Sequence, residues 1–165
     1  MLRKLVSLCS LSACLTGSLL AEQTYEKNGV RFTHGDSEKV TVTGEKIKTI
    51  RIENAEGATF IIQNHGAAIT PEKLQGMMTE SLLKHFENGA TELTHKTAQR
   101  TLLGEPRNGR YILFSKNNIP SESLLFTFQK DGDTLCVITQ MALQHSQEAE
   151  RMFAQIQNSL ELIKN

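Results

Sequence analysis

Apolar residues alternate with polar ones in several short runs between residues 25 and 64. Val40 and Val42, for example, are separated by threonine, which is the two-residue period of a half-buried strand. Asn28–Gly29 predicts a hairpin turn, because both residue types tolerate a positive φ. This part of the chain is therefore expected to form short strands joined by turns.

A different period begins at Thr70–Pro71–Glu72, where threonine can cap free N–H groups and proline is tolerated at the first helical position. From Pro71 to Asn88 the apolar residues recur every 3.6 positions, and Gly89 supplies the end of the predicted helix. At 100° per residue, one arc of this helix holds most of its apolar side chains, and His85 falls inside the same arc. The apolar members of the arc are Leu74, Met77, Met78, Leu82 and Phe86.

A second run of strands is predicted after this helix. The segments are Arg100–Leu103, Arg110–Ser115, Ser123–Lys130 and Thr134–Leu143, with turns at Gly104–Gly109 and Asp131–Asp133. Short turns require antiparallel neighbours. The last strand carries apolar residues on both faces, which predicts a sheet covered on both sides. One face has Leu135, Val137, Met141 and Leu143, and the other has Cys136, Ile138 and Ala142.

The C-terminal part predicts a second amphipathic helix from Gln147 to Ile163, with Ser146 as its cap. Each helix has a single apolar stripe, so each packs through one face. Two such helices and a sheet that is apolar on both sides predict an α+β fold, in which an antiparallel sheet is sandwiched by helices.

Composition narrows the function classes. The chain has 165 residues, with 18 basic and 18 acidic side chains. Because 39% of the residues are hydrophobic and the net charge is zero, a disordered chain is excluded, and so is nucleic-acid binding through bulk charge. The length predicts one domain, and three cysteines are too few for a disulfide-dense scaffold.

The first 21 residues read as an export signal. Met1–Lys4 is basic, and the next 17 residues, Leu5 to Ala21, carry no charge. Cleavage after Ala21 would leave a single domain of residues 22–165, with 16 basic and 18 acidic residues and no transmembrane span. The alternative is a bacterial lipobox at Leu11–Cys14, in which Cys14 becomes the lipid-bearing N-terminus. The first route predicts a periplasmic or extracellular protein, and the second a membrane-anchored lipoprotein.

The order of elements from residue 58 to residue 162 resembles the PsbP-like superfamily, which includes the DcrB-like periplasmic lipoproteins. The stretches that carry the resemblance are Ala58–Asn64, Pro71–Asn88, Gly109–Tyr111, Asp131–Thr139 and Phe153–Leu160. The resemblance implies a PsbP-like α/β/α sandwich and a role as an accessory or interaction protein. It does not imply a catalytic residue in this chain.

Candidate chemistry is sparse. None of the five histidines is spaced as HxH, HxxxH or HExxH, so no single element presents two metal ligands, and no metal or cofactor is expected. His85 is expected in the core, and His65, in the loop before the first helix, is a candidate for the helix N-terminus. Cys136 is expected to be a small core residue. Ser81–Lys84 matches Ser-x-x-Lys, but it lies within a helix and lacks the other elements of that chemistry.

These observations favour an exported, non-catalytic cell-envelope accessory or interaction protein, with no catalytic residue assigned. One alternative is a small-ligand carrier with a pocket between the sheet and the first helix, made adaptable by Met77 and Met78. Another is a small hydrolase or metal-dependent enzyme assembled from distant histidines. The expected partner is an envelope protein or a small ligand, not a nucleic acid.

Overall fold

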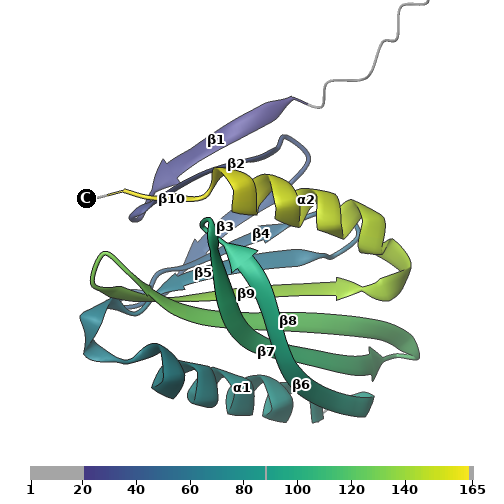
Figure 1. Ribbon diagram of the computed structural model, residues 1–165. Coiled ribbons are helices and arrows are strands. Elements are labelled where there is room, and N and C mark those ends of the chain that lie inside the picture. Colours follow the sequence, from purple (N-terminus) through teal and green to yellow (C-terminus); the bar gives the residue numbers. More distant parts are fainter. Residues whose placement is uncertain (1–20, 88, 164–165) are drawn as a thin grey trace, which may run out of the picture.

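A seven-stranded antiparallel sheet forms the middle layer of the computed structural model, which describes residues 21–87 and 89–163 (Figure 1). Its strands lie in the order β3, β4, β5, β9, β8, β7, β6. In chain order their bounds are β3 Lys39–Thr43, β4 Thr49–Glu53, β5 Thr59–Asn64, β6 Ala90–Leu102, β7 Glu105–Lys116, β8 Ile119–Lys130 and β9 Asp133–Ala142.

Helix α1 (Pro71–Glu87) covers one face of this sheet, and helix α2 (Ser146–Ser159) covers the other (Figure 1). Two short 3-10 helices precede them, η1 at Gly66–Ala68 and η2 at Leu143–His145. The predicted α+β fold with an antiparallel sheet between helices is confirmed. Within residues 21–87 and 89–163, neither helix is both long and apolar enough to cross a membrane.

A second sheet of three strands lies beside α2 (Figure 1). It consists of β1 (Glu22–Lys27), β2 (Val30–Gly35) and β10 (Glu161–Leu162), with β2 in the middle and both neighbours antiparallel to it. The export signal predicted before residue 21 and the alternative lipid site at Cys14 lie outside the described residues.

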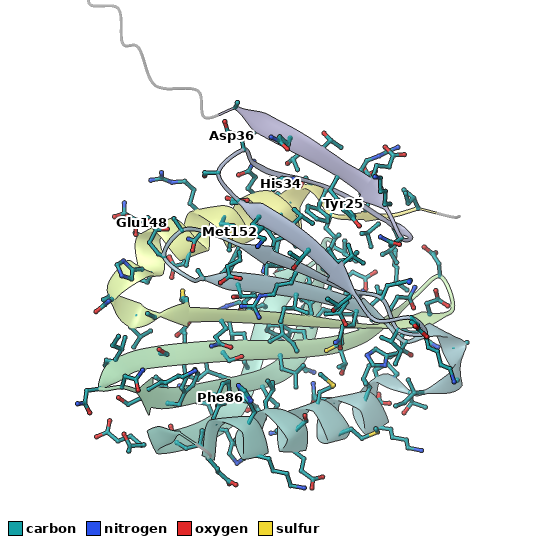
Figure 2. The ribbon with its side chains drawn as sticks, turned by 180° about the vertical axis from the view of Figure 1, so that it is seen from behind. Tyr25, His34, Asp36, Phe86, Glu148 and Met152 are labelled. Carbon is teal, nitrogen blue, oxygen red and sulfur yellow. The ribbon has the colours of Figure 1, made fainter. Side chains whose placement is uncertain are left out.

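The core is divided by the large sheet. On the α2 side, eighteen buried hydrophobic residues form one cluster, in which the rings of Phe60 and Phe153 lie 6.0 Å apart. On the α1 side there are two smaller clusters, one around Leu74 and Leu125 and one around Phe86, which stacks on Phe114 at 4.0 Å. Figure 2 shows Phe86 and Met152 on opposite sides of the sheet.

Helix α1 packs four of the five apolar residues of the predicted arc into the core, where they are wholly or partly buried, but two other members of the arc lie outside the core. The four are Leu74, Met78, Leu82 and Phe86. Met77 is 54% exposed, and His85 is exposed as well. At 100° per residue, Leu82 and Phe86 lie roughly 80° further round the helix than Leu74 and Met78. The side of the helix that contacts the twisted sheet therefore changes along its length. In the second half of α1, His85 no longer lies on that side.

One of the predicted turns and the start of one strand need correction. The segment Gly104–Gly109 is not a turn, because Leu103 and Gly104, both with positive φ, already connect β6 to β7. Strand β6 also begins ten residues before the predicted Arg100. The tight turn after β8 is confirmed, with Asp131 and Gly132 at positive φ and Lys130 paired with Asp133.

Helix α2 ends four residues before the predicted Ile163. The hydroxyl of Ser159 donates to the Gln155 carbonyl and accepts the N–H of Thr33, both at 2.8 Å, and the next residues pair with β2. The predicted cap is also wrong: Ser146 is already helical, and His145 precedes it without a side-chain cap.

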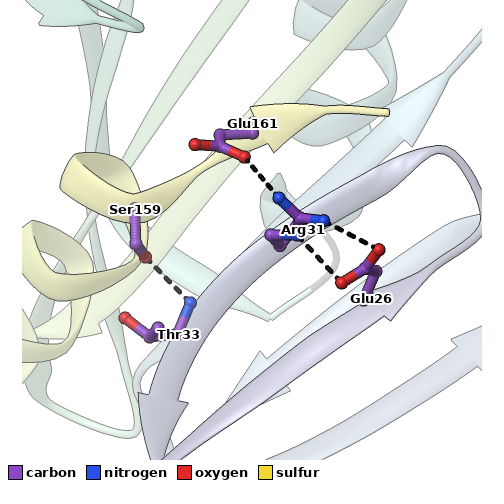
Figure 3. A network of polar contacts seen from close by, with 5 residues as sticks. All are labelled: Glu26, Arg31, Thr33, Ser159 and Glu161. Carbon is purple, nitrogen blue, oxygen red and sulfur yellow. Dashed lines mark hydrogen bonds and ion pairs between the residues drawn. The ribbon is translucent and has the colours of Figure 1, made fainter. Parts of the chain in front are cut away.

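An ion-pair network joins the three strands of the small sheet (Figure 3). The guanidinium of Arg31 on β2 donates two hydrogen bonds of 2.9 Å to Glu26 on β1 and one of 3.1 Å to Glu161 on β10. All three side chains are accessible to solvent, so the network adds little free energy to the backbone pairing of these strands.

Candidate functional site

The structure disperses the candidate residues taken from the sequence. His85 is exposed on α1, edge-on to the Phe86 ring at 5.6 Å, so the expectation of a core histidine is wrong. His65 lies at the start of η1 and not at the N-terminus of α1. Its Nε2 is 3.2 Å from the Gln63 side-chain oxygen, and partial burial lowers its pKa.

Cys136 lies in the centre of β9 and is fully buried, as expected. It packs in the cluster that contains Leu74, Leu125 and Ile138. Burial raises the pKa of its thiol to about 12, so the side chain stays protonated and shielded at neutral pH.

His34 is a buried histidine that was not among the residues predicted from the sequence. It is only 6% exposed, and its Nδ1 lies 2.7 Å from the Gly35 carbonyl oxygen (Figure 2). The two-residue period of Val30, Phe32 and His34 along β2 was the signal that could have placed it inward. Nearby, burial raises the pKa of Glu38, although a hydrogen bond from the Gly35 N–H and the charge of His34 act in the opposite direction.

Within the described residues, no three histidine, cysteine or acidic side chains are grouped as metal ligands. The pocket expected between the sheet and the first helix is also different from the prediction. Met78 packs into the cluster around Leu74, and Met77 points to solvent. A hollow of about 380 Å³ on that side lies instead at the first turn of α1, beside Pro71 and Gln75.

A large hollow lies on the other side of the sheet, along α2. It measures about 680 Å³ and lies between the C-terminal part of α2, strand β10 and the β6–β7 turn. A second hollow of about 250 Å³ lies between α2 and strands β6, β8 and β9, and Gln157 lines both. We call the two together the α2 groove.

The α2 groove is lined by both apolar and charged side chains. Leu124, Phe126 and Phe153 line the smaller hollow, together with Arg100 and Glu150. Lys130 and Glu161 line the larger one. Such a groove is able to hold apolar and charged groups of the same ligand.

A tyrosine–carboxylate pair lies beside the smaller hollow. The Tyr111 hydroxyl donates a 2.7 Å hydrogen bond to Glu122, which lines that hollow. Burial and this bond raise the pKa of Tyr111 to about 12, while the charge of Arg100 acts in the opposite direction. The ammonium of Lys96 lies 5.1 Å from the centre of the Tyr111 ring, so the ring lies close to two cations.

Arg100 on β6 is directly opposite Arg107 on β7. Like charges at opposed positions of an antiparallel pair repel each other. Arg107 is compensated, because it forms an ion pair with Glu105 and its guanidinium lies 4.7 Å from the centre of the Phe128 ring. Among the described residues, Arg100 has no ion-pair partner within 4.0 Å.

Comparison with known proteins adds information about the fold. No protein-family profile and no curated protein matches the sequence. The structure is similar to the solution structure of cyanobacterial PsbP (CyanoP) from Synechocystis sp. PCC 6803, with a TM-score of 0.57 and 10% identity over 93% of this chain and 99% of that one. The chain has a PsbP-like fold.

The PsbP-like fold is shared with a second solved structure. LpqN, described as involved in cell envelope biogenesis of Mycobacterium tuberculosis, aligns with a TM-score of 0.52 and 13% identity over 87% of this chain and 91% of its own. The resemblance inferred from the stretches between residues 58 and 162 is therefore confirmed as a fold relationship, and it extends over the N-terminal strands too.

Proposed function

We propose that the protein is an exported, non-catalytic component of the cell envelope that binds another protein through the α2 groove. The observation that carries the proposal is the groove itself, a hollow of about 680 Å³ beside one of about 250 Å³, with a shared wall on α2. Its mixture of apolar and charged lining residues suits a protein partner better than a purely apolar ligand.

The positions of the reactive side chains support binding over catalysis. Cys136 is buried and its pKa is raised, His85 stands alone on the outer face of α1, and His65 contacts an amide. General acid–base or nucleophilic catalysis needs such groups within hydrogen-bond reach of one another and of a substrate.

Two further features support the envelope setting. The first 21 residues have the charge and hydropathy pattern of an export signal. LpqN, which shares the fold, is described as involved in cell envelope biogenesis. We infer a similar setting for this protein, either free in the periplasm or outside the cell, or anchored through Cys14.

Site-specific photo-crosslinking in cells tests the interaction. A photoreactive amino acid replaces Gln157, which lines both hollows, and in a matched control it replaces Lys73, which is exposed on α1. We expect a discrete crosslinked product from position 157 and none from position 73. Equal products from both positions, or none from either, would contradict a specific partner at the groove.

The intact mass of the exported protein tests its processing. We expect a chain that begins at Glu22. A mass that corresponds to a chain beginning at Cys14 with acyl chains attached would show that the protein is anchored in the membrane and not free.

A further inference from the structure

Strand β6 is a long and exposed sheet edge. It spans 13 residues, from Ala90 to Leu102, whereas β3 at the other edge of the same sheet spans only five. In the described part of the chain, β6 pairs with β7 on one side only, and nearly all its residues from Thr91 to Thr101 are exposed (Figure 1). Proteins usually keep such edges short or block them, because they accept further strands.

Only the start of β6 is blocked by its backbone. A bulge shifts the register between Thr91 and Thr94, and Glu92 in this bulge has a positive φ of 58°. From Thr94 to Leu102 the pairing with β7 is continuous. A regular edge of nine residues therefore remains, which is long enough to pair with one more strand.

The charges on this edge discriminate between incoming strands. Lys96 and Arg100 are four residues apart and lie on the α2 side of β6, with the small Ala98 between them. They repel a second cationic strand. Because Arg100 faces Arg107 and has no carboxylate within 4.0 Å among the described residues, an incoming carboxylate would relieve an existing repulsion.

The surroundings do not cancel this positive charge. Residues 90–130 contain six basic and three acidic residues, whereas the rest of residues 22–165 contains ten basic and fifteen acidic. Of the three acidic residues, Glu105 is paired with Arg107 and Glu122 accepts a hydrogen bond from Tyr111. Glu150, on α2, faces Arg100 across the smaller hollow without forming an ion pair within 4.0 Å.

We propose that β6 binds an extended acidic segment of the partner protein as an additional strand, with two carboxylates four residues apart that contact Lys96 and Arg100. This inference rests on the proposed function and names the chemistry of the partner. Main-chain hydrogen bonds along the edge supply affinity, and the alternate side chains supply specificity. The residue between the two carboxylates lies over Ala98, where an apolar side chain has room.

A second copy of this chain is the main competing occupant. Its β1 strand carries Glu22 and Glu26 at the required spacing. However, Arg31 already binds both oxygens of Glu26 at 2.9 Å. A contact between β6 of one copy and β1 of the next would also leave free edges at both ends and so would continue into open chains, which is why the inference favours a separate partner.

The test uses the mature protein and a synthetic peptide, Thr-Ser-Glu-Thr-Leu-Thr-Glu-Ser-Thr, with blocked ends and a fluorescent label. We expect saturable binding by fluorescence anisotropy. The double substitution Lys96→Glu/Arg100→Glu should weaken it by about tenfold or more and should create binding to the peptide with lysines in place of the glutamates. The matched control Lys46→Glu/Lys48→Glu, at the exposed turn beside the other sheet edge, should leave the affinity unchanged.

Alternate N-methylation of the peptide distinguishes strand pairing from simple charge attraction. Successive residues of a strand direct their N–H groups to opposite edges, so methylation of one alternate set should abolish binding and methylation of the other should preserve it. Equal binding of the two methylated peptides, or no binding of the parent peptide, would overturn the acidic-strand inference.

Sedimentation of the protein alone completes the test. We expect a monomer. A dimer or larger species that dissociates when Lys96→Glu/Arg100→Glu is introduced would show that a second copy binds the β6 edge, and it would overturn the inference. A failed peptide titration together with a specific crosslink from position 157 would reject only the acidic strand. Loss of the crosslink as well would reject the proposed function itself.

Discussion

The two faces of the large sheet are packed in different ways. On the α2 face, eighteen buried hydrophobic residues from both sheets and the helix form a single cluster. On the α1 face, seven buried hydrophobic residues are divided between two clusters, and polar residues lie among them. There, Thr127 donates a 2.8 Å hydrogen bond to the Pro71 carbonyl, and Thr134 donates one to the Ile69 carbonyl. The α2 face thus holds the domain together, whereas the α1 face positions a helix by local anchors.

Truncation of one buried aliphatic residue on each face tests this comparison most directly. Ile156 on α2 and Leu74 on α1 are 0% and 1% exposed. We expect Ile156→Ala to lower the free energy of unfolding by about 4 kcal/mol and Leu74→Ala by about 2 kcal/mol, because a continuous core relaxes less around a cavity than a small cluster under a movable helix. Urea unfolding followed by circular dichroism measures both. Equal losses would contradict the difference between the faces.

A pair of glycines gives the next largest effect. A Cβ at Gly109 on β7 would lie 2.3 Å from the Leu125 carbonyl oxygen and 2.4 Å from the Phe126 ring, whereas at Gly76 on α1 it would meet nothing within 4 Å. We expect Gly109→Ala to destabilise the fold by about 3 kcal/mol, because the two strands must separate. Gly76→Ala should stabilise it by about 1 kcal/mol, since glycine is unfavourable within a helix. Thermal unfolding of the two variants measures both effects. A Gly109→Ala protein that is more stable than the parent would disprove the close contact between the strands.

Alkaline pH acts on the α1 face through Cys136. Its pKa is raised from 9.0 to about 12 by burial, so the unfolded thiol ionises before the folded one. A raised pKa contributes stability that is complete below pH 9 and is lost as the pH rises towards 12. Between these two pH values, we expect ionisation of Cys136 to lower the free energy of unfolding by about 1.4 kcal/mol per pH unit.

The substitution Cys136→Ala should remove this part of the pH dependence. The pH dependence of stability that comes from Tyr111 should remain, because its raised pKa affects stability only above pH 10. Rapid reaction of native Cys136 with a thiol reagent at neutral pH would show that the side chain is not shielded.

The smallest expected changes in stability distinguish polar residues on the α1 face that form hydrogen bonds from a polar residue there that forms none. Thr127→Val removes the hydrogen bond to Pro71 and should cost about 1 kcal/mol. Ser123 is also buried, but its hydroxyl has no hydrogen-bond partner among the described residues, so Ser123→Ala should change stability by no more than about 0.5 kcal/mol. Chemical unfolding of the two variants side by side checks this. The opposite order would show that Ser123 holds an ordered water.

The sequence predicts the existence of α1 and most of its contact residues, but it makes the buried face too wide. Thr70, Pro71 and Glu72 identify the helix start because capping is local chemistry. The buried face also depends on the twist of the sheet beneath the helix, so Met77 and His85 are exposed although they lie within the predicted arc.

The errors in the strands have a similar origin. Pro106 and Gly109 look like turn residues, but Pro106 lies before the first residue of β7 that pairs with β8, so its missing N–H is tolerated there. Gly109 is needed because β8 approaches its backbone closely. The α2 groove and the opposed Arg100 and Arg107 depend on strand register, which local periodicity does not specify.

The contact between β2 and β10 also determines an order of events during folding. It joins Arg31 and Glu161, which are 130 residues apart, whereas β6 to β9 are consecutive hairpins with two-residue turns. Closing a long loop costs more chain entropy than closing a short one, so the hairpins should form first and the pairing of β10 with β2 last. Pulse-labelled hydrogen exchange during refolding should show protection of β7 to β9 before that of β10. A growing chain would then lack the third strand of its second sheet until Glu161 and Leu162 had been made, so the edge of β2 on that side would stay unpaired for most of its synthesis.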